Sequence, residues 1–334
     1  VIGVWLHIPY GGGHIYSDIA TVFQVRECGG GWQCNLAIPY IQIFVEYPVI
    51  VSTFMYLMGV LGSLLPGSLL DNYYFFTSIF LAIPTFLLIK ETLKIAEIIR
   101  VEEKRILPYL VATPSFIFML LLNWYVIGVF FTVFGIRKLL QGSQKTSGIL
   151  LGLSAASNLV TAVPALGMLF TIKGWRGKVM FTSSALLTYA LVNAPFFFLN
   201  PQNWFAFWQF HNNWCIEGSW MCAFLPRTSP LRHYIFLVSF ILLSAIIFLM
   251  ARRIKDNGLI ELSWLSTFAF LFSTYVYTPQ MNLLLLPFFT LFPIVKRYWE
   301  FLAFEIVNSL VIILGFSQIL LVFGITYHIE AFAY

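Results

Sequence analysis

Long runs of apolar residues recur along this chain of 334 residues and limit what it can fold into. Several runs match the roughly 20 residues that a helix needs to cross a bilayer. Only 10% of the residues are charged, against about 25% in an ordinary soluble domain, which is too little to cover a water-facing surface. These features exclude a soluble enzyme, a nucleic-acid-binding domain and a disordered tail, and they predict an all-α polytopic membrane protein.

Clusters of Lys and Arg separate the apolar stretches. The stretches cover residues 48–66, 70–89, 106–136, 147–172, 179–199, 233–251, 259–277, 281–295 and 301–326. The basic clusters lie at 90–105, 137–145, 173–178, 252–255 and 296–297. Because basic loops stay on the cytoplasmic side, we expect all five clusters inside. Sixteen of the 19 basic residues are then cytoplasmic, and only Arg26, Arg227 and Arg232 lie outside. The net charge of +5 therefore indicates orientation rather than an anionic partner such as nucleic acid.

Three of the stretches are not expected to cross as single helices. The stretches 106–136 and 147–172 begin and end inside, so each predicts a hairpin of short helices, broken near Asn123 and at Asn158 and Pro164 respectively. The stretch 48–66 begins and ends outside and predicts a juxtamembrane or re-entrant helix.

We expect a single transmembrane domain over residues 1–334, with about nine to eleven membrane helices. The chain opens without Met on an apolar segment that is too short to span, so a first transmembrane helix is expected to be missing at the N-terminus.

Two large loops on the expected outer face, residues 10–47 and 199–232, hold all four cysteines. These are Cys28 and Cys34 in the first loop and Cys215 and Cys222 in the second. An even number confined to the extracytoplasmic face favours disulfides, most simply paired within each loop. Pairing between the loops and four free buried thiols are the alternatives. A metal is not expected, since neither a CxxC spacing nor a histidine cluster is present.

Acidic residues on the outer face are functional candidates, because a carboxylate beside a bilayer is costly unless it is solvated or paired. They are Asp18, Glu27, Glu46, Asp71, Glu217 and Glu330. Asp18 has an equally weighted alternative as a helix cap, since it follows Ser17 and precedes an apolar run. The Trp-rich segment 203–208 is read first as an interfacial aromatic belt. No nucleotide-binding glycine motif is present in the sequence.

Several short motifs occur in an order that resembles glycosyltransferase family 87 of the GT-C superfamily, which is related to the GPI mannosyltransferases. They are Tyr16-Ser17-Asp18-Ile19, Pro39-Tyr40, Glu46-Tyr47-Pro48, Leu122-Asn123-Trp124-Tyr125, Asn193-Ala194-Pro195, Asn200-Pro201, Trp204, Glu217-Gly218-Ser219-Trp220 and Tyr277-Thr278-Pro279-Gln280. The resemblance spans roughly residues 14–290 and implies a GT-C-like helical bundle. It departs from the family pattern at Tyr125, where the family has Asp, and at Asn158, where it often has Lys.

The resemblance implies an inverting transfer of a sugar, mannose or another hexose or pentose, from a polyprenyl- or dolichyl-phosphate carrier. The acceptor is a hydroxyl of a glycolipid or glycan on the outer face of the plasma membrane. No cofactor is implied beyond the lipid-linked donor, and membrane lipids are the expected surroundings; no protein partner is indicated.

In this reading Asp18 is the general base. The substrate-binding candidates are Tyr16, Arg26, Glu46, Tyr47, Asn123, His211, Glu217, Trp220, Arg227, Arg232 and Gln280. Five of these are assigned to the leaving phosphate by their expected side of the membrane alone: Arg26, His211, Arg227, Arg232 and Gln280. A non-catalytic subunit of a membrane complex and a lipid or solute transporter are the alternatives. The transporter is disfavoured because almost every charge lies in a loop or at a helix end.

Overall fold

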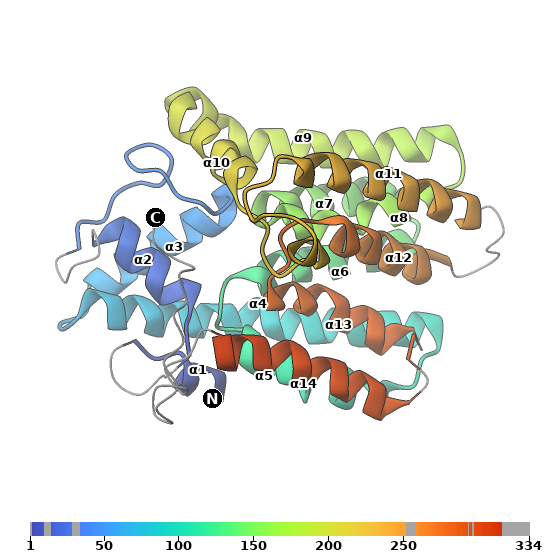
Figure 1. Ribbon diagram of the computed structural model, residues 1–334, viewed down its shortest axis with the longest axis horizontal. Coiled ribbons are helices and arrows are strands. Elements are labelled where there is room, and N and C mark those ends of the chain that lie inside the picture. Colours follow the sequence, from blue (N-terminus) through green and yellow to red (C-terminus); the bar gives the residue numbers. More distant parts are fainter. Residues whose placement is uncertain are drawn as a thin grey trace.

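The computed structural model describes residues 2–9, 15–28, 34–251, 258–292, 294–295 and 297–315. This part of the chain is helical, with no strand and only two isolated backbone bridges, Pro39–Ile43 and Glu217–Val276. The longer helices run side by side as a bundle, and the short helices α1 (Ile2–Leu6) and α2 (Asp18–Glu27) lie toward one end of it (Figure 1). The predicted all-α architecture is confirmed for these residues.

Two helices are long and apolar enough to cross a membrane. They are α9 (Trp175–Leu199) and α11 (Leu231–Ala251), with mean hydropathies of 1.3 and 2.7. Only 6% of the apolar window of either helix is buried, whereas the core helix of a soluble protein is mostly buried. Leu187 on α9 and Leu242 on α11 are about 60% exposed. The structure thus has two candidate membrane spans, and the further spans expected from the sequence belong to the proposal below.

The two stretches predicted as hairpins break where proline and asparagine predicted, whereas the third, 48–66, forms one continuous helix that ends before Pro66. The first forms a π-helical turn η2 (Leu107–Val111), α5 (Pro114–Met119) and α6 (Tyr125–Leu140), with the break around Asn123. The second forms α7 (Gln144–Ser157), the 3-10 turn η3 (Leu159–Ala162) and α8 (Ala165–Thr171). Asn158 caps η3 by accepting from the Val160 amide at 3.0 Å. Helix α3 (Val49–Ser63) has 15 residues. It is about 22 Å long, shorter than the roughly 30 Å hydrocarbon core.

Two expectations are wrong: the length of the helix that begins near residue 70, and the absence of helices from the two expected outer loops. Helix α4 (Leu69–Ile99) continues ten residues past the expected end at 89, and Arg100 ends it in a left-handed conformation. Its extension is held by Glu91, which is buried and paired with Arg137 of α6. The two expected outer loops, residues 10–47 and 199–232, are called the first and second outer segments below. The first contains α2, and the second contains α10 (Pro201–Asn213) and the 3-10 turn η4 (Trp220–Ala223).

The last part of the chain follows the predicted order with shorter elements. It consists of α12 (Gly258–Ser273), the turn η5 (Pro279–Met281), α13 (Asn282–Leu291) and α14 (Tyr298–Gly315). A further short turn, η1 (Glu103–Arg105), lies between α4 and η2. The expected continuation of α14 to residue 326 lies outside the described residues, as do basic residues Arg252 and Lys296.

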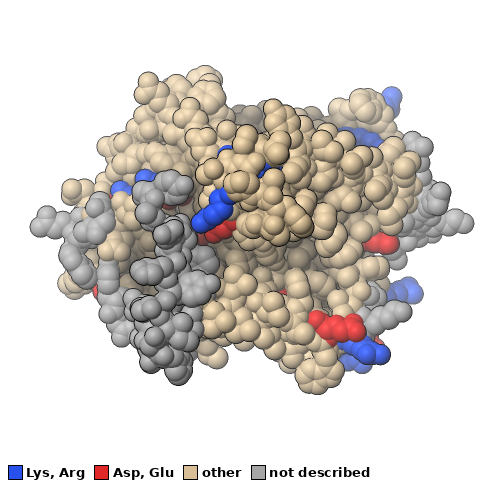
Figure 2. All heavy atoms as spheres, in the orientation of Figure 1, with Lys and Arg blue, Asp and Glu red and all other residues tan. Residues whose placement is uncertain are grey.

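The two ends of the bundle differ in what they carry. The end of α4, the start of α9, the end of α11 and the start of α14 lie together at the right of Figure 1, whereas α2, α3 and α10 lie at the left. These right-hand ends adjoin the basic clusters of the sequence. Most of the surface in Figure 2 is uncharged, and the charged side chains visible there lie both toward this end and around the middle and left of the view.

Helices α7 and α9 pack backbone to backbone through two glycines four residues apart. A Cβ on Gly148 would lie 2.2 Å from the Phe181 carbonyl oxygen, and one on Gly152 would lie 2.5 Å from that of Ala185. Small residues at this spacing let two helices approach closely, which is typical of helix packing in membranes. This contact fixes α9 against the bundle and leaves its other face exposed.

We expect Gly152→Leu to destabilise the protein by about 1–3 kcal/mol, because the added side chain forces α7 and α9 apart. The control is Ala190→Leu, which adds the same side chain on the exposed surface of α9. Thermal unfolding in detergent should show a lower midpoint for Gly152→Leu alone. Equal midpoints for the two variants would contradict the close packing.

Candidate functional site

Four residues from three distant segments meet around one carboxylate. The Tyr47 hydroxyl donates to Asp18 Oδ2 at 2.6 Å, and Asn123 Nδ2 donates to the same oxygen at 3.5 Å. Tyr16 donates a further side-chain hydrogen bond to Asp18. All four residues were predicted site residues, and the structure brings them together.

The start of α2 is anchored to the break in the hairpin, which places Asp18 beside Asn123. The buried Ser17 hydroxyl donates to the carbonyls of Leu121 at 2.8 Å and Leu122 at 3.2 Å. The Ile19 amide donates to the Leu122 carbonyl at 3.4 Å. Ser17 is the N-cap residue and Asp18 is the first residue of the helix, so the capping alternative for Asp18 is wrong.

Tyr47 is held in place through its backbone and its ring. Its carbonyl accepts hydrogen bonds from the Tyr40 hydroxyl and, at 2.7 Å, from the Ser52 hydroxyl in the first turn of α3. Its ring packs edge-on against Trp124 with a centroid distance of 4.7 Å. The phenol therefore has little freedom to leave Asp18.

The Asn123 side chain connects Asp18 to the start of α6. It is buried, and its Oδ1 accepts from the Tyr125 amide at 2.9 Å, which satisfies one of the free amides at the start of the helix. With Oδ1 engaged, the amide nitrogen is the group turned to Asp18.

Burial is the main influence on the ionisation of this cluster. It raises the pKa of Asp18, while the hydrogen bonds from Tyr47, Tyr16 and Asn123 lower it and the nearby Glu46 charge raises it. Burial and the charge of Asp18 also raise the pKa values of Tyr16 and Tyr47, so both phenols stay neutral donors. The result is a desolvated carboxyl group with a raised pKa, surrounded by neutral donors.

An ion pair lies next to this cluster. Arg26 Nε lies 2.7 Å from Glu46 Oε2, and the guanidinium packs over the Phe44 ring at 4.9 Å from its centroid. Phe44 in turn contacts Phe210 of α10, with ring centroids 5.8 Å apart. The predicted residues Arg26 and Glu46 thus bind each other and link the first outer segment to the second.

Helix α10 joins the first outer segment through its N-cap. Asn200 accepts from the Asn203 amide at 3.1 Å and donates to the Ile41 carbonyl at 3.1 Å. His211, at the end of α10, has its Nδ1 2.9 Å from the Phe207 carbonyl oxygen. Burial lowers the pKa of His211, and the Glu46 charge opposes this shift. His211 is therefore close enough to the ion pair to interact with it.

The remaining predicted residues form a separate group in the second outer segment. Glu217 accepts from Trp214 Nε1 at 2.7 Å, and Trp220 Nε1 donates to the Phe272 carbonyl at 2.7 Å. Gln280 lies in η5, beyond the turn on which Glu217 packs.

Two predicted phosphate ligands of this segment have other partners. Arg232 donates to the carbonyls of Thr228 and Ser229, and Arg227 donates to Cys215 Sγ at 3.4 Å. Within the described part of the chain, neither arginine contacts the Asp18 cluster.

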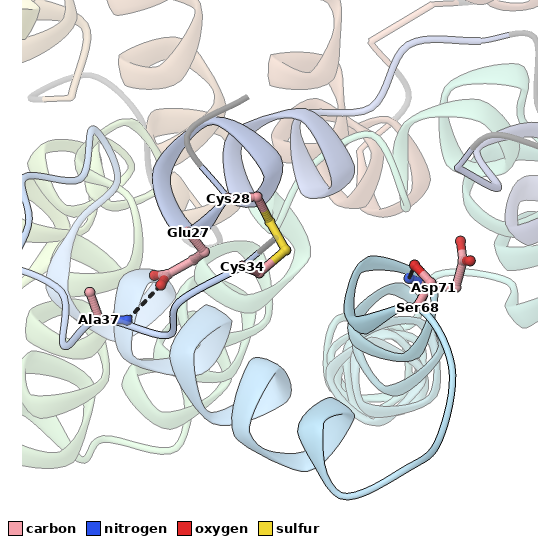
Figure 3. Close-up of a disulfide and its surroundings, with 6 residues drawn as sticks. All are labelled: Glu27, Cys28, Cys34, Ala37, Ser68 and Asp71. Atoms are coloured by element: carbon pink, nitrogen blue, oxygen red, sulfur yellow. Dashed lines mark hydrogen bonds between the residues drawn. A yellow bond between two sulfur atoms is a disulfide. The ribbon is translucent and has the colours of Figure 1, made fainter. Parts of the chain in front are cut away.

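One of the two predicted disulfides is present. Cys28 and Cys34 are bonded, with an S–S distance of 2.06 Å (Figure 3). The bond closes the end of α2 onto the following segment, where Glu27 also accepts from the Ala37 amide at 2.7 Å. Figure 3 also shows Ser68 capping α4 through the Asp71 amide.

Cys215 and Cys222 are free thiols, so the predicted Cys215–Cys222 pairing is wrong, as are pairing between the loops and four free thiols. Between these two cysteines, Glu217 is bound to the backbone of Tyr275 and Tyr277, and Ser219 starts the turn η4. The segment between the two cysteines is therefore held against residues 275–277 by backbone hydrogen bonds and is not closed into a ring by a disulfide.

Sequence reasoning missed a buried polar group behind the second outer segment. Glu305, Asn308, Asn282 and Ser115 lie within the bundle and are linked by hydrogen bonds. A lone acid inside an apolar stretch was the available signal, since Glu305 interrupts residues 301–326.

Tyr125 and Asn158, where the sequence departs from the pattern it resembles, lie close together. The Asn158 side chain is near enough to influence the Tyr125 phenol, although the two residues are 33 positions apart. Searches against protein-family models, curated proteins and solved structures found no significant match.

We expect Asp18→Asn to raise the midpoint of thermal unfolding at pH 7 to 8. The folded state raises the pKa of Asp18, so this residue's contribution to stability is present below its ordinary pKa and lost as the pH rises through the folded value. Asparagine removes that loss, and the advantage of the variant should disappear at acidic pH. Glu46→Gln is the control and should not stabilise, because it breaks the pair with Arg26. A pH-independent difference would contradict the raised pKa.

Proposed function

We propose that this chain is a membrane glycosyltransferase that moves a sugar from a polyprenyl- or dolichyl-phosphate carrier to an acceptor hydroxyl, with inversion, on the extracytoplasmic face. The observation that carries the proposal is the Asp18 carboxyl, which three neutral donors from separate motifs hold in place. A raised pKa suits a general base, because proton transfer is most efficient when the pKa of the base lies near the working pH.

The reaction is a single displacement. The acceptor oxygen attacks the anomeric carbon and forms the new glycosidic bond, and its proton passes to Asp18. The bond between the anomeric carbon and the phosphate oxygen breaks, and the electron pair leaves with the polyprenyl phosphate. Of the three outer arginines, Arg26 reaches the Asp18 cluster through Glu46, so we assign the leaving phosphate to Arg26.

An apolar cavity beside the cluster suits the hydrocarbon of a lipid carrier. Its volume is about 410 Å³, and it is lined by α1, α4 and the segment from Phe116 to Leu121. Leu121 is one of its lining residues, and the Leu121 carbonyl accepts from the Ser17 hydroxyl next to Asp18. In the proposed complex the lipid tail occupies this cavity and the headgroup lies toward Asp18. The membrane setting is supported by the exposed apolar helices α9 and α11.

Transport of a lipid or solute is the second candidate. It is favoured by Glu305 and the Glu91–Arg137 pair, because ionisable residues buried in a membrane bundle often mark a substrate or ion pathway. A non-catalytic subunit is the third. Both differ from the first proposal in predicting no sugar transfer.

We expect Asp18→Asn to lower turnover by about 10²–10⁴-fold, because the amide keeps the shape but cannot accept the proton. Binding of the carrier lipid should persist. The measurement is transfer of a radiolabelled sugar from a polyprenyl-phosphate donor by the purified protein. Glu46→Gln is the matched control; it loses only a partly exposed ion pair and should keep turnover within about tenfold of wild type.

Each other result has a defined meaning. Near-normal transfer by Asp18→Asn with an inactive Glu46→Gln would exchange the two roles. If both variants are fully active, Asp18 is not the base. Absence of transfer by the unmutated protein from every polyprenyl-phosphate donor would favour a transporter or a subunit.

The proposed topology is tested by labelling introduced cysteines from either side of the membrane. In a background without Cys215 and Cys222, a cysteine at Gln144 should react only from the cytoplasm, because it adjoins a basic cluster. A cysteine at Asn203 in α10 should react only from outside. Labelling at Asn203 from the cytoplasm would refute the orientation.

A further inference from the structure

We infer that helix α14 positions residues 214–223 of the second outer segment through Glu305 and Asn308. The inference rests on the proposed function where it concerns substrates, and on contacts alone where it concerns position. It assigns a role to the buried polar group that the proposed reaction does not use.

The polar group around Glu305 and Asn308 is buried. Glu305 is fully buried and Asn308 nearly so, one turn apart on α14. Glu305 accepts from the Ser115 amide at 3.0 Å and from Asn282 Nδ2 at 3.4 Å, and it forms no ion pair within the described residues. Neutral donors thus replace a cation, and a polar network inside a bundle specifies one arrangement of the elements it joins.

The same group links α14 to the turn before α13. Asn308 Nδ2 donates to the Pro279 carbonyl at 3.0 Å and to Ser115 Oγ at 3.1 Å. The Tyr277 hydroxyl donates to Asn282 Oδ1 at 2.5 Å and to Asn308 Oδ1 at 3.3 Å. Two of these hydrogen bonds, from Asn308 to Pro279 and from Tyr277 to Asn308, hold the turn against α14, and the bond from Asn308 to Ser115 holds α14 against α5.

Backbone hydrogen bonds link that turn to the second outer segment. The Glu217 amide donates to the Tyr275 carbonyl at 2.9 Å, and the Tyr277 amide donates to the Glu217 carbonyl at 2.8 Å. Gly218 has a positive φ of 60°, and a Cβ there would lie 2.0 Å from the Tyr277 carbonyl oxygen. These two hydrogen bonds and the close approach of Gly218 therefore hold the backbone around Glu217 against Tyr277.

The apolar cavity and the second outer segment are formed by different elements of the structure. The apolar cavity is lined by α1, α4 and α5. On α10, Phe210 contacts Phe44 beside the Arg26–Glu46 pair, and Trp214 packs on Phe210 with ring centroids 5.0 Å apart. The second segment presents Glu217, Trp214 and Trp220, all at least partly exposed. If the carrier occupies the cavity, the second segment faces the acceptor, and α14 controls acceptor binding as a positioning helix.

A native thiol provides the test of position. The chain has four cysteines, of which Cys28 and Cys34 form the disulfide, so Cys222→Ser leaves Cys215 as the single free thiol. Cys215 lies two residues before Glu217 and is partly buried. Its rate of reaction with a maleimide in detergent micelles reports how firmly the second segment is held.

We expect Asn308→Leu in this background to speed the labelling of Cys215 about threefold to tenfold, the effect of losing one or two hydrogen bonds. Tyr277→Phe, which removes only the hydroxyl, should give a smaller increase. Ser309→Ala is the matched control, because this buried neighbour on α14 has a hydroxyl without a hydrogen-bond partner in the described structure. Its labelling rate should equal that of the parent.

A folded Asn308→Leu variant with an unchanged labelling rate overturns the inference. If that variant does not fold, an unchanged rate in Tyr277→Phe decides against it in the same way. In transfer assays the same variants should raise KM for the acceptor and leave kcat and the KM for the lipid donor unchanged. A fall in kcat at constant KM overturns the assignment to the acceptor. Faster labelling with no transfer even by the unmutated protein refutes the proposed function and leaves the positioning role standing.

Discussion

The arrangement of the site depends on the hydrogen bonds that the carbonyls of Leu121 and Leu122 accept from the start of α2. The break at Asn123 ends the α5 segment and leaves these groups without partners in a helix, and buried backbone groups must be paired. The Ser17 hydroxyl and the Ile19 amide satisfy them. Because these residues flank Asp18, the same hydrogen bonds that complete the broken hairpin bring Asp18 to Asn123. The interruption in the helix and the formation of the site are therefore one structural event.

Neutral hydrogen-bond donors serve in this chain where soluble enzymes commonly use charges. Asp18 is held by two phenols and an amide, and Glu305 is held by a backbone amide and an amide side chain. Phenols and amides fix a carboxyl group in place without adding a second charge that would have to be desolvated. Such partners also leave Asp18 with a raised pKa, whereas a direct contact with Arg26 would lower it. Because Arg26 pairs with Glu46 and not with Asp18, the pKa of Asp18 stays raised.

Local signals in the sequence predicted local features well. Asparagine and proline located the breaks near Asn123 and Asn158, and six-residue spacing located the Cys28–Cys34 bond, because each depends on residues close together in the chain. The wrong Cys215–Cys222 pairing shows the limit of this reasoning. That segment is shaped by backbone hydrogen bonds to Tyr275 and Tyr277, about 60 residues away, and spacing carries no information about such contacts. The extension of α4 past residue 89 likewise depends on the distant Arg137.

The neighbouring positions Tyr125 and Asn158 bear on how the proposed donor would be held. The resemblance places an acid at the first position and often a lysine at the second, and the structure puts these positions in contact. Loss of one charge alone would leave the other buried and unpaired, which is strongly destabilising. The phenol and the amide at these two positions avoid that cost and keep two polar side chains there. In the proposed reaction, the charge of the leaving phosphate would then be left to Arg26.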